Sequence, residues 1–128
     1  MANGTIAFDT LSTSGQISGT AVSVDTDYLA YGSAKSWGGA NNAAVINDSL
    51  NVASSADNGT GQYTHNLTNA MNQDINNLGA TACIHTDSGV ARYFGSGTTA
   101  SAAKLRCVDE DFADEDHVHA FVIHGDLA

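Results

Sequence analysis

Two histidines near the C-terminus are the first residues whose types and spacing could bind a metal ion. His117 and His119 are separated by one residue, and side chains two residues apart on a β-strand face the same side. If a threefold axis gathered this strand from three subunits, the imidazoles could ligate one transition metal. The spacing is short and common, so we favour the alternative that both are histidines of the surface or of a subunit interface.

A run of acidic residues precedes these histidines. Residues 109–116 hold six carboxylates in eight positions, and several oxygen ligands are what a calcium ion requires. The run lacks the glycine and the ligand spacing of an EF-hand loop. We therefore expect a solvated acidic loop, with calcium binding as the alternative.

Sequence signatures of catalysis are absent. The chain has no Gly-x-Ser-x-Gly elbow, no nucleophile motif around Cys83 or Cys107, and no glycine-rich phosphate loop before a helix. Two cysteines are too few for a disulfide framework, so we expect buried free thiols. The sequence predicts a protein that is not an enzyme, with no catalytic residue and no cofactor.

Composition restricts the partners of the chain. Its 128 residues suit one domain, and 14 acidic against four basic residues give a formal charge of −10. Such a charge opposes binding to nucleic acid or to an anionic membrane. No apolar run approaches the roughly 18–20 residues that span a bilayer, and no secretion signal opens the chain, so we expect assembly in a bacterial cytoplasm.

The elements that must position these residues are short strands. The chain has 13 glycines and no proline, and Asn58-Gly59 predicts a tight turn before an alternating strand. Regularly spaced strands with turns between them predict an all-β fold, a small antiparallel sandwich or jelly-roll-like domain. The expected strands are 34–37, 43–46, 49–52, 62–67, 78–85, 90–94, 104–108 and 117–124. Residues 67–78 have helical spacing, but their asparagines favour a turn or a single helical turn.

The first third of the chain differs from the rest. Residues 1–33 are polar with isolated apolar residues, so we expect an extended N-terminal docking arm, followed by the sandwich domain at residues 34–128. Trp37 is expected to anchor the core. The predicted docking and interface residues are Ile6, Phe8 and Leu11 in the arm, and Tyr28 and Tyr31 at a subunit contact.

The middle of the chain carries a recognisable pattern. It runs through Ala34-Lys35-Ser36-Trp37, Asp48-Ser49-Leu50-Asn51-Val52, Asp57-Asn58-Gly59-Thr60-Gly61-Gln62-Tyr63-Thr64 and Ala70-Met71. This pattern resembles small virion proteins of tailed bacteriophages, and residues 4–11 resemble N-termini of the same group. The chain departs from the pattern at Gly38-Gly39-Ala40, where a bulkier residue is usual, and at Asn72, where proline is common.

The resemblance implies a function. It implies a homotrimeric structural protein on the virion surface, most simply a capsid decoration or cement protein whose partners are itself and the major capsid protein or another virion protein. A composition rich in glycine and alanine, with few large apolar residues, also favours subunits that complete one another. The alternatives are a short tail fibre or knob that recognises a host receptor through residues 88–101 and 109–116, and a free glycan-binding module.

Overall fold

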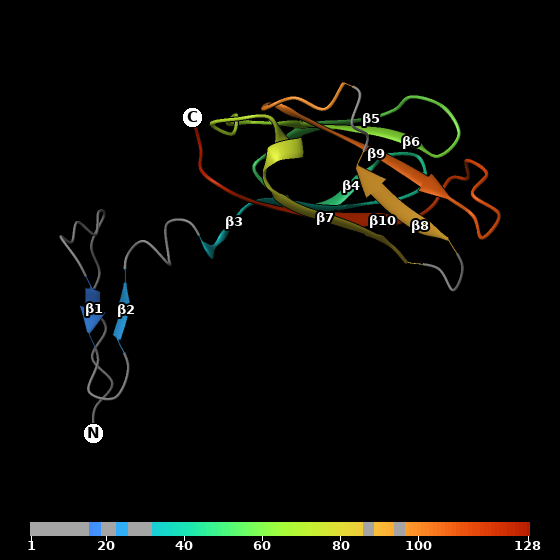
Figure 1. Cartoon of the computed structure of the whole chain (residues 1–128). Helices are drawn as coiled ribbons and strands as arrows, with labels where there is room; N and C mark the ends of the chain where they lie inside the picture. The colour runs from blue at the N-terminus through green and yellow to red at the C-terminus, as the bar shows by residue number, and fades with distance from the viewer. Residues whose placement is uncertain (1–15, 19–22, 26–31, 86–88, 94–96) are drawn as a thin grey trace.

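Two four-stranded antiparallel sheets packed face to face form the body of the protein (Figure 1). The computed structural model describes residues 16–18, 23–25, 32–85, 89–93 and 97–128. The β10 sheet has the order β4-β3-β10-β7 and the β6 sheet the order β5-β6-β9-β8. The strands of the β10 sheet are β3 (Ala34–Ala40), β4 (Ile46–Leu50), β7 (Gly79–Ile84) and β10 (His119–His124). Those of the β6 sheet are β5 (Val52–Asp57), β6 (Gln62–Leu67), β8 (Val90–Tyr93) and β9 (Ala102–Val108). The predicted all-β antiparallel fold is confirmed.

Most strand predictions agree with the structure to within about two residues, apart from those between residues 43 and 52. There, residues 41–45 form a turn that is closed by the hydrogen bond from the Ala44 N–H to the Asn41 carbonyl, and β4 and β5 are separated at Asn51. Asn51 has a φ of 58°, a conformation that asparagine tolerates better than most residues. Its side chain donates to the Asn69 carbonyl (3.0 Å) and accepts from the Asn69 N–H (2.7 Å). Asn51 is therefore the point where the chain leaves one sheet for the other.

The predicted single helical turn is present as a 3₁₀ helix, η1 (Ile75–Asn77). Ile75 and the nearby Met71 are buried in the core. Within the described part of the chain, no helix is long and apolar enough to cross a membrane.

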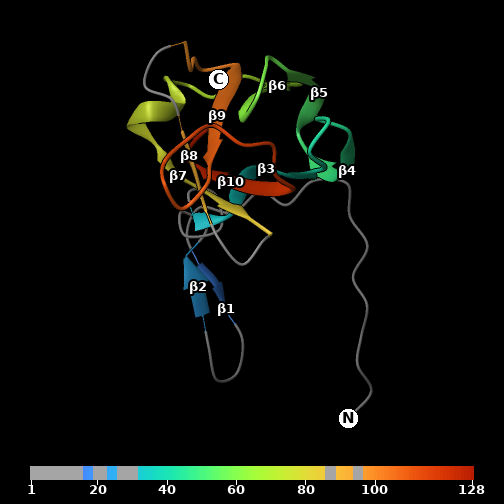
Figure 2. The same cartoon turned by 90° about the vertical axis from the view of Figure 1, so that its right-hand side faces the viewer.

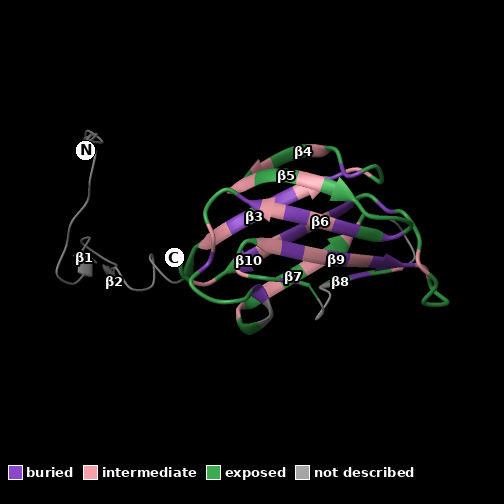
Figure 3. Cartoon of the chain, turned by 90° about the horizontal axis from the view of Figure 1, so that it is seen from above, coloured by how far each residue is buried: buried purple, intermediate pink, exposed green. Residues whose placement is uncertain are grey.

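The core lies between the sheets, where alternate residues of the central strands are buried (Figure 3). Its largest fully buried side chains include Tyr63, His65, Leu105 and Ile123. Residues of β3 facing the core are small: a Cβ added at Gly38 would lie 3.0 Å from the Phe121 ring. The inward side of β3 therefore has no room for a large side chain.

The predicted turn at Asn58-Gly59 is confirmed between β5 and β6. The Asn58 N–H donates to the Gln62 carbonyl and the Gln62 N–H to the Gly59 carbonyl, both at 2.8 Å. Gly61, just before β6, has a φ of +67°, and a Cβ there would lie 2.3 Å from the Cys107 carbonyl oxygen. Glycine is required at this position because the backbone of β9 passes too close for any side chain.

Before β3 the structure describes a separate two-stranded antiparallel ribbon, β1 (Gln16–Ser18) and β2 (Ser23–Asp25). Its register pairs Ile17 with Val24. Neither strand belongs to the β10 sheet or the β6 sheet as described (Figures 1 and 2). The five predicted docking residues, Ile6, Phe8, Leu11, Tyr28 and Tyr31, lie outside the described residues.

Candidate functional site

A pair of histidines joins the two sheets through the centre of the core. His65 on β6 and His119 on β10 have no exposed surface, and their Nε2 atoms are 3.0 Å apart. The His65 ring stacks on Phe121 with a centroid distance of 4.6 Å, and the His119 ring lies 4.2 Å from that of Tyr63. The prediction of a surface or interface position for His119 is wrong, because it faces inward at the start of β10.

His117 is also buried, but it precedes β10 and does not share a strand face with His119. Its Nε2 atom lies 3.2 Å from Oε2 of Glu115, whereas the Nε2 atom of His119 is directed at His65. Among the described residues, no group of three or more His, Cys, Asp or Glu side chains is arranged to hold a metal ion. The two histidines thus have separate partners within the chain.

The hydrogen bonds of the buried pair define where its protons lie. Nδ1 of His119 is 2.9 Å from the His117 carbonyl oxygen, which can only accept, so this nitrogen carries a proton. In a neutral ring Nε2 of His119 then accepts, and Nε2 of His65 donates to it. Nδ1 of His65 is left as an acceptor for the Ser55 hydroxyl at 2.8 Å. One arrangement of protons therefore gives hydrogen-bond partners to the His117 carbonyl, His119, His65 and Ser55 in turn, while both imidazoles stay neutral.

Burial keeps these rings uncharged. It lowers the pKa of His65 to about 3, with the neighbouring His119 as the second cause. Burial also lowers the pKa of His119, an effect that the hydrogen bond to the His117 carbonyl partly opposes. The same core raises the pKa of the Cys107 thiol to about 11, first through burial and then through Asp116. The core is thus a low-dielectric region that disfavours charge on each of these groups.

The order Ser55, His65, His119 matches the order nucleophile, base and orienting group in hydrolases. Two features of this chain oppose that chemistry. Both imidazoles lack exposed surface, so a substrate cannot contact them, and a base whose pKa is about 3 accepts a proton poorly at neutral pH. The geometry supports a structural role in holding β5, β6 and β10 together.

The acidic run 109–116 makes more hydrogen bonds and ion pairs within the chain than a solvated loop would make. Oδ1 of Asp109 accepts from the N–H groups of Asp111 (2.9 Å) and Ala113 (2.8 Å). Asp114 forms an ion pair with Arg106 on β9, whose hydrogen bond is the main cause of the lowered pKa of that carboxyl. Four of the six carboxylates have partners in the chain: those of Asp109 and Asp114, that of Glu115 beside His117, and that of Asp116.

Asp116 connects the run to the turn before β6. Its Oδ1 atom accepts from the Gly61 N–H at 2.6 Å and from the Tyr63 hydroxyl at 3.2 Å. Burial, followed by the charge of Asp116, raises the pKa of Tyr63 above its usual value. The Gly61 carbonyl in turn accepts from the Cys107 N–H at 2.7 Å. Gly61 is therefore the residue where the turn, β9 and the acidic run meet.

The outer face of the β10 sheet is apolar at its centre. Trp37 is 37% exposed and lies on this face, so the prediction that it anchors the core is wrong; Gly38 and Phe121 fill the inner side instead. The strand register aligns Trp37 between Leu50, which is 47% exposed, and Val122. These three residues form a continuous apolar row across β4, β3 and β10.

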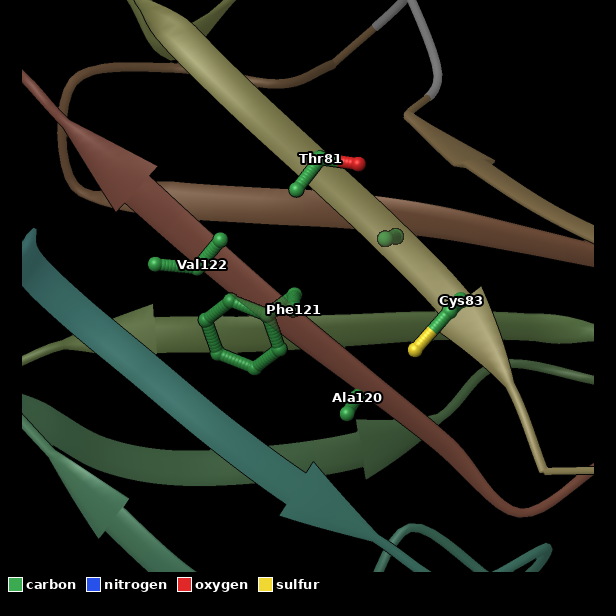
Figure 4. A pocket seen from close by; sticks show the side chains of 6 residues that line it. Thr81, Cys83, Ala120, Phe121 and Val122 are labelled. Carbon is green, nitrogen blue, oxygen red and sulfur yellow. The ribbon is translucent and has the colours of Figure 1, made fainter.

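Beside this row the same face is hollowed. The hollow measures about 190 Å³ and is almost wholly apolar; its lining residues are Thr81, Ala82, Cys83, Ala120, Phe121 and Val122 (Figure 4). Cys83 is exposed, which corrects the prediction of two buried thiols, whereas Cys107 is buried as predicted. We use the name apolar face for Leu50, Trp37, Val122 and this hollow.

The outer faces of the two sheets differ in charge. In the four strands of the β10 sheet, Lys35 and Asp48 are the only residues with a full charge, and they have opposite signs. In the β6 sheet, β8 and β9 contain three of the four basic residues of the chain, Arg92, Lys104 and Arg106. The apolar face is therefore electrically neutral in a chain of charge −10.

Sequence reasoning did not single out the pair of His65 and His119 or the apolar face. The alternation of Tyr63, His65 and Leu67 in β6 was the available signal for a core histidine, because all three occupy one side of the strand. Comparison of the chain with protein-family models, curated proteins and solved structures found no match.

Proposed function

We propose that this chain is a non-enzymatic structural protein on the exterior of a tailed-phage virion, a homotrimeric capsid decoration or cement protein. In this proposal the subunits assemble in the host cytoplasm and bind the major capsid protein or another virion protein. The N-terminal segment 1–33 is the docking arm, with Ile6, Phe8 and Leu11 against the particle and Tyr28 and Tyr31 at the subunit contact.

The observation that carries the proposal is the neutral, apolar outer face of the β10 sheet in a chain whose net charge is −10. Exposed Trp37 and Leu50 in a single cross-strand row are typical of a surface that another protein covers. A chain of charge −10 is repelled by nucleic acid, which favours a position on the outside of a DNA-filled shell. A protein that binds only the assembled shell shifts the equilibrium toward the intact particle.

Two residues of the pattern that resembles phage virion proteins have structural roles in this fold. Gly61 permits the close approach of β9, and Asn51 holds the crossing between the two sheets. These roles explain both residues within this chain, and the virion setting of the proposal is supported by the resemblance alone.

Particle association tests the proposal. Tagged chain is mixed with purified particles that lack it, from the phage whose genome encodes it, and the particles are sedimented. We expect saturable co-sedimentation and a higher temperature of DNA release. If the chain binds neither capsids nor tails, the virion role is rejected. Binding confined to tails would favour the short fibre or knob.

A further inference from the structure

The turn between β5 and β6 contains an Asn-Gly dipeptide, Asn58-Gly59, whose two residues are exposed to water (Figure 1). Asparagine before glycine is prone to deamidation, because glycine has no side chain to shield its main-chain nitrogen. We propose that Asn58 is a latent deamidation site, which the folded hairpin keeps unreacted through two hydrogen bonds. The inference does not depend on the proposed virion role.

Deamidation begins with an attack within the main chain. The Gly59 nitrogen attacks Cγ of Asn58 and loses its proton, so that a new C–N bond closes a five-membered succinimide ring. The bond from Cγ to Nδ2 breaks, and the leaving nitrogen takes up the proton and departs as ammonia. Water then opens the ring at one of its two carbonyls, which gives aspartate or isoaspartate. Water is the only other reactant.

The first hydrogen bond anchors the side chain that would be attacked. Nδ2 of Asn58 donates to Oγ1 of Thr64 at 2.7 Å. Thr64 lies on β6 opposite Ala56 of β5, so this bond crosses the hairpin. An amide anchored in this way is not free to turn its Cγ toward the Gly59 nitrogen. The nitrogen that would leave as ammonia is also the one that Thr64 binds.

The second hydrogen bond holds the attacking nitrogen. The Gly59 N–H donates to Oδ1 of Asp57 at 2.9 Å. This nitrogen becomes a nucleophile only by losing its proton, and a carboxylate is too weak a base to remove an amide proton. Negative charge on the nitrogen would also form next to the negative charge of Asp57, which is unfavourable.

The main chain of the turn adds to this restraint. The Asn58 N–H donates to the Gln62 carbonyl, and the Gln62 N–H donates to the Gly59 carbonyl, both at 2.8 Å. Closure of the succinimide ring requires rotation of the main chain between these two bonds, so it breaks the turn. The reaction therefore has to await a local opening of the hairpin.

The products would not fit the hairpin. Aspartate at position 58 would place a second carboxylate beside Asp57, and it would remove the amide that donates to Thr64. Isoaspartate would add one carbon to the main chain, so the N–H of residue 58 and the Gln62 carbonyl would lose their alignment. Gly61, whose position against β9 leaves no room for a side chain, follows directly. Protection of Asn58 thus preserves the junction of the turn, β9 and the acidic run.

The test follows deamidation at Asn58 in the full-length protein by peptide mass spectrometry, at constant temperature and mildly alkaline pH. Thr64→Val removes the acceptor, while valine keeps nearly the shape of threonine and also favours strands. The matched control is Ser54→Ala, which removes an equivalent bond of the same hairpin, from Nδ2 of Asn66 to the Ser54 hydroxyl at 3.0 Å. Thr64→Ser retains the hydroxyl. Circular dichroism during the incubation shows which proteins are folded.

In the folded unaltered protein we expect Asn58 to deamidate several-fold more slowly than in the same chain unfolded in urea. Folded Thr64→Val should react several-fold faster than the folded unaltered protein, whereas Ser54→Ala and Thr64→Ser should match it. Equal rates in the folded and unfolded chain would overturn the inference. Equal rates in folded Thr64→Val and Ser54→Ala would overturn it as well.

A second variant keeps the inference testable if Thr64→Val does not fold. Asp57→Ala removes the acceptor of the Gly59 N–H and should also accelerate deamidation in the folded protein. In urea, the second Asn-Gly dipeptide of the chain, Asn3-Gly4, provides the reference rate for this pair of residues. An Asp57→Ala rate equal to that of Ser54→Ala would contradict the inference. Because no phage particle is involved, these outcomes are independent of virion binding.

Discussion

Acid should destabilise the sandwich through its buried histidines, between pH 7 and pH 5. In the folded protein burial lowers the pKa of His65 to about 3, whereas in the unfolded chain an unperturbed histidine has a pKa of about 6.5. As the pH falls below about 6.5, the unfolded chain binds a proton that folded His65 does not bind. Stability is therefore lost as the pH falls, and it is fully present above the unfolded pKa.

The size of the effect follows from the two pKa values. A pH of 5 lies about 1.5 units below the pKa of histidine in the unfolded chain. At about 1.4 kcal/mol per unit, the proton that only the unfolded chain binds lowers the free energy of unfolding by about 2 kcal/mol. His119 contributes in the same direction, because burial also lowers its pKa. The ionisable groups around the pair are Tyr63, His85, His117 and, through the Tyr63 hydroxyl, Asp116. Most carboxyl groups stay ionised down to pH 5, so the effect belongs mainly to histidines.

The assay is urea unfolding at pH 7, 6 and 5, followed by circular dichroism. The unaltered protein should lose at least about 2 kcal/mol of unfolding free energy over this range. His65→Gln should be less stable at pH 7 but should lose less on acidification, whereas His124→Gln, at an exposed position, should retain the full dependence. A flat profile for the unaltered protein, or an equal slope in His65→Gln, would refute the reasoning.

The proton arrangement can be checked without a variant. Nitrogen-15 NMR of the imidazoles should show His119 protonated at Nδ1 and His65 protonated at Nε2 at neutral pH. The His65 ring should remain neutral at pH 5 for as long as the protein stays folded. A folded protein with a charged His65 at pH 5 would contradict the structural explanation.

Three further predictions concern the turn before β6, the thiols and the acidic run. Gly61→Ala should lower the free energy of unfolding by about 3 kcal/mol or more, because the residue has a positive φ and its Cβ would meet the Cys107 carbonyl. Gly39 has open space around it, so Gly39→Ala should change the free energy of unfolding by less than about 0.5 kcal/mol in the same urea assay. An equal effect of both would count against the proposed packing. A maleimide reagent should modify Cys83 in the folded protein and leave Cys107 unmodified until the protein unfolds, as mass spectrometry of labelled peptides can show. Millimolar calcium or a chelator should leave the thermal midpoint unchanged, because groups of the chain itself already contact four carboxylates of residues 109–116. A rise of the midpoint with calcium would restore the metal hypothesis.

Local signals in the sequence predicted the local structure well. Asn58-Gly59 favours a tight turn through local backbone preferences. The alternation of β6 identified a strand whose limits match the structure. The departures have a common cause. Which side of a strand faces the core depends on the opposing sheet, and Trp37 lies outside because the Phe121 ring occupies the space beneath Gly38.

The buried histidine pair illustrates the same limit. His65 and His119 are 54 positions apart in the chain and meet because β6 and β10 belong to facing sheets. No spacing within the sequence encodes that contact. The His-x-His spacing therefore paired His119 with His117 in the prediction, rather than with His65. The apolar face depends likewise on a register that aligns three strands, which periodicity along one strand does not reveal.

The central claim is that the chain is a repeated structural component of the exterior of a virion. Quantitative mass spectrometry of purified particles, before and after brief treatment with an external protease, tests it most directly. The proposal predicts on the order of hundreds of copies per particle, in a multiple of three, that the protease removes while the capsid stays intact. Absence of the chain from purified particles, or its complete protection from protease inside an intact shell, would contradict the claim.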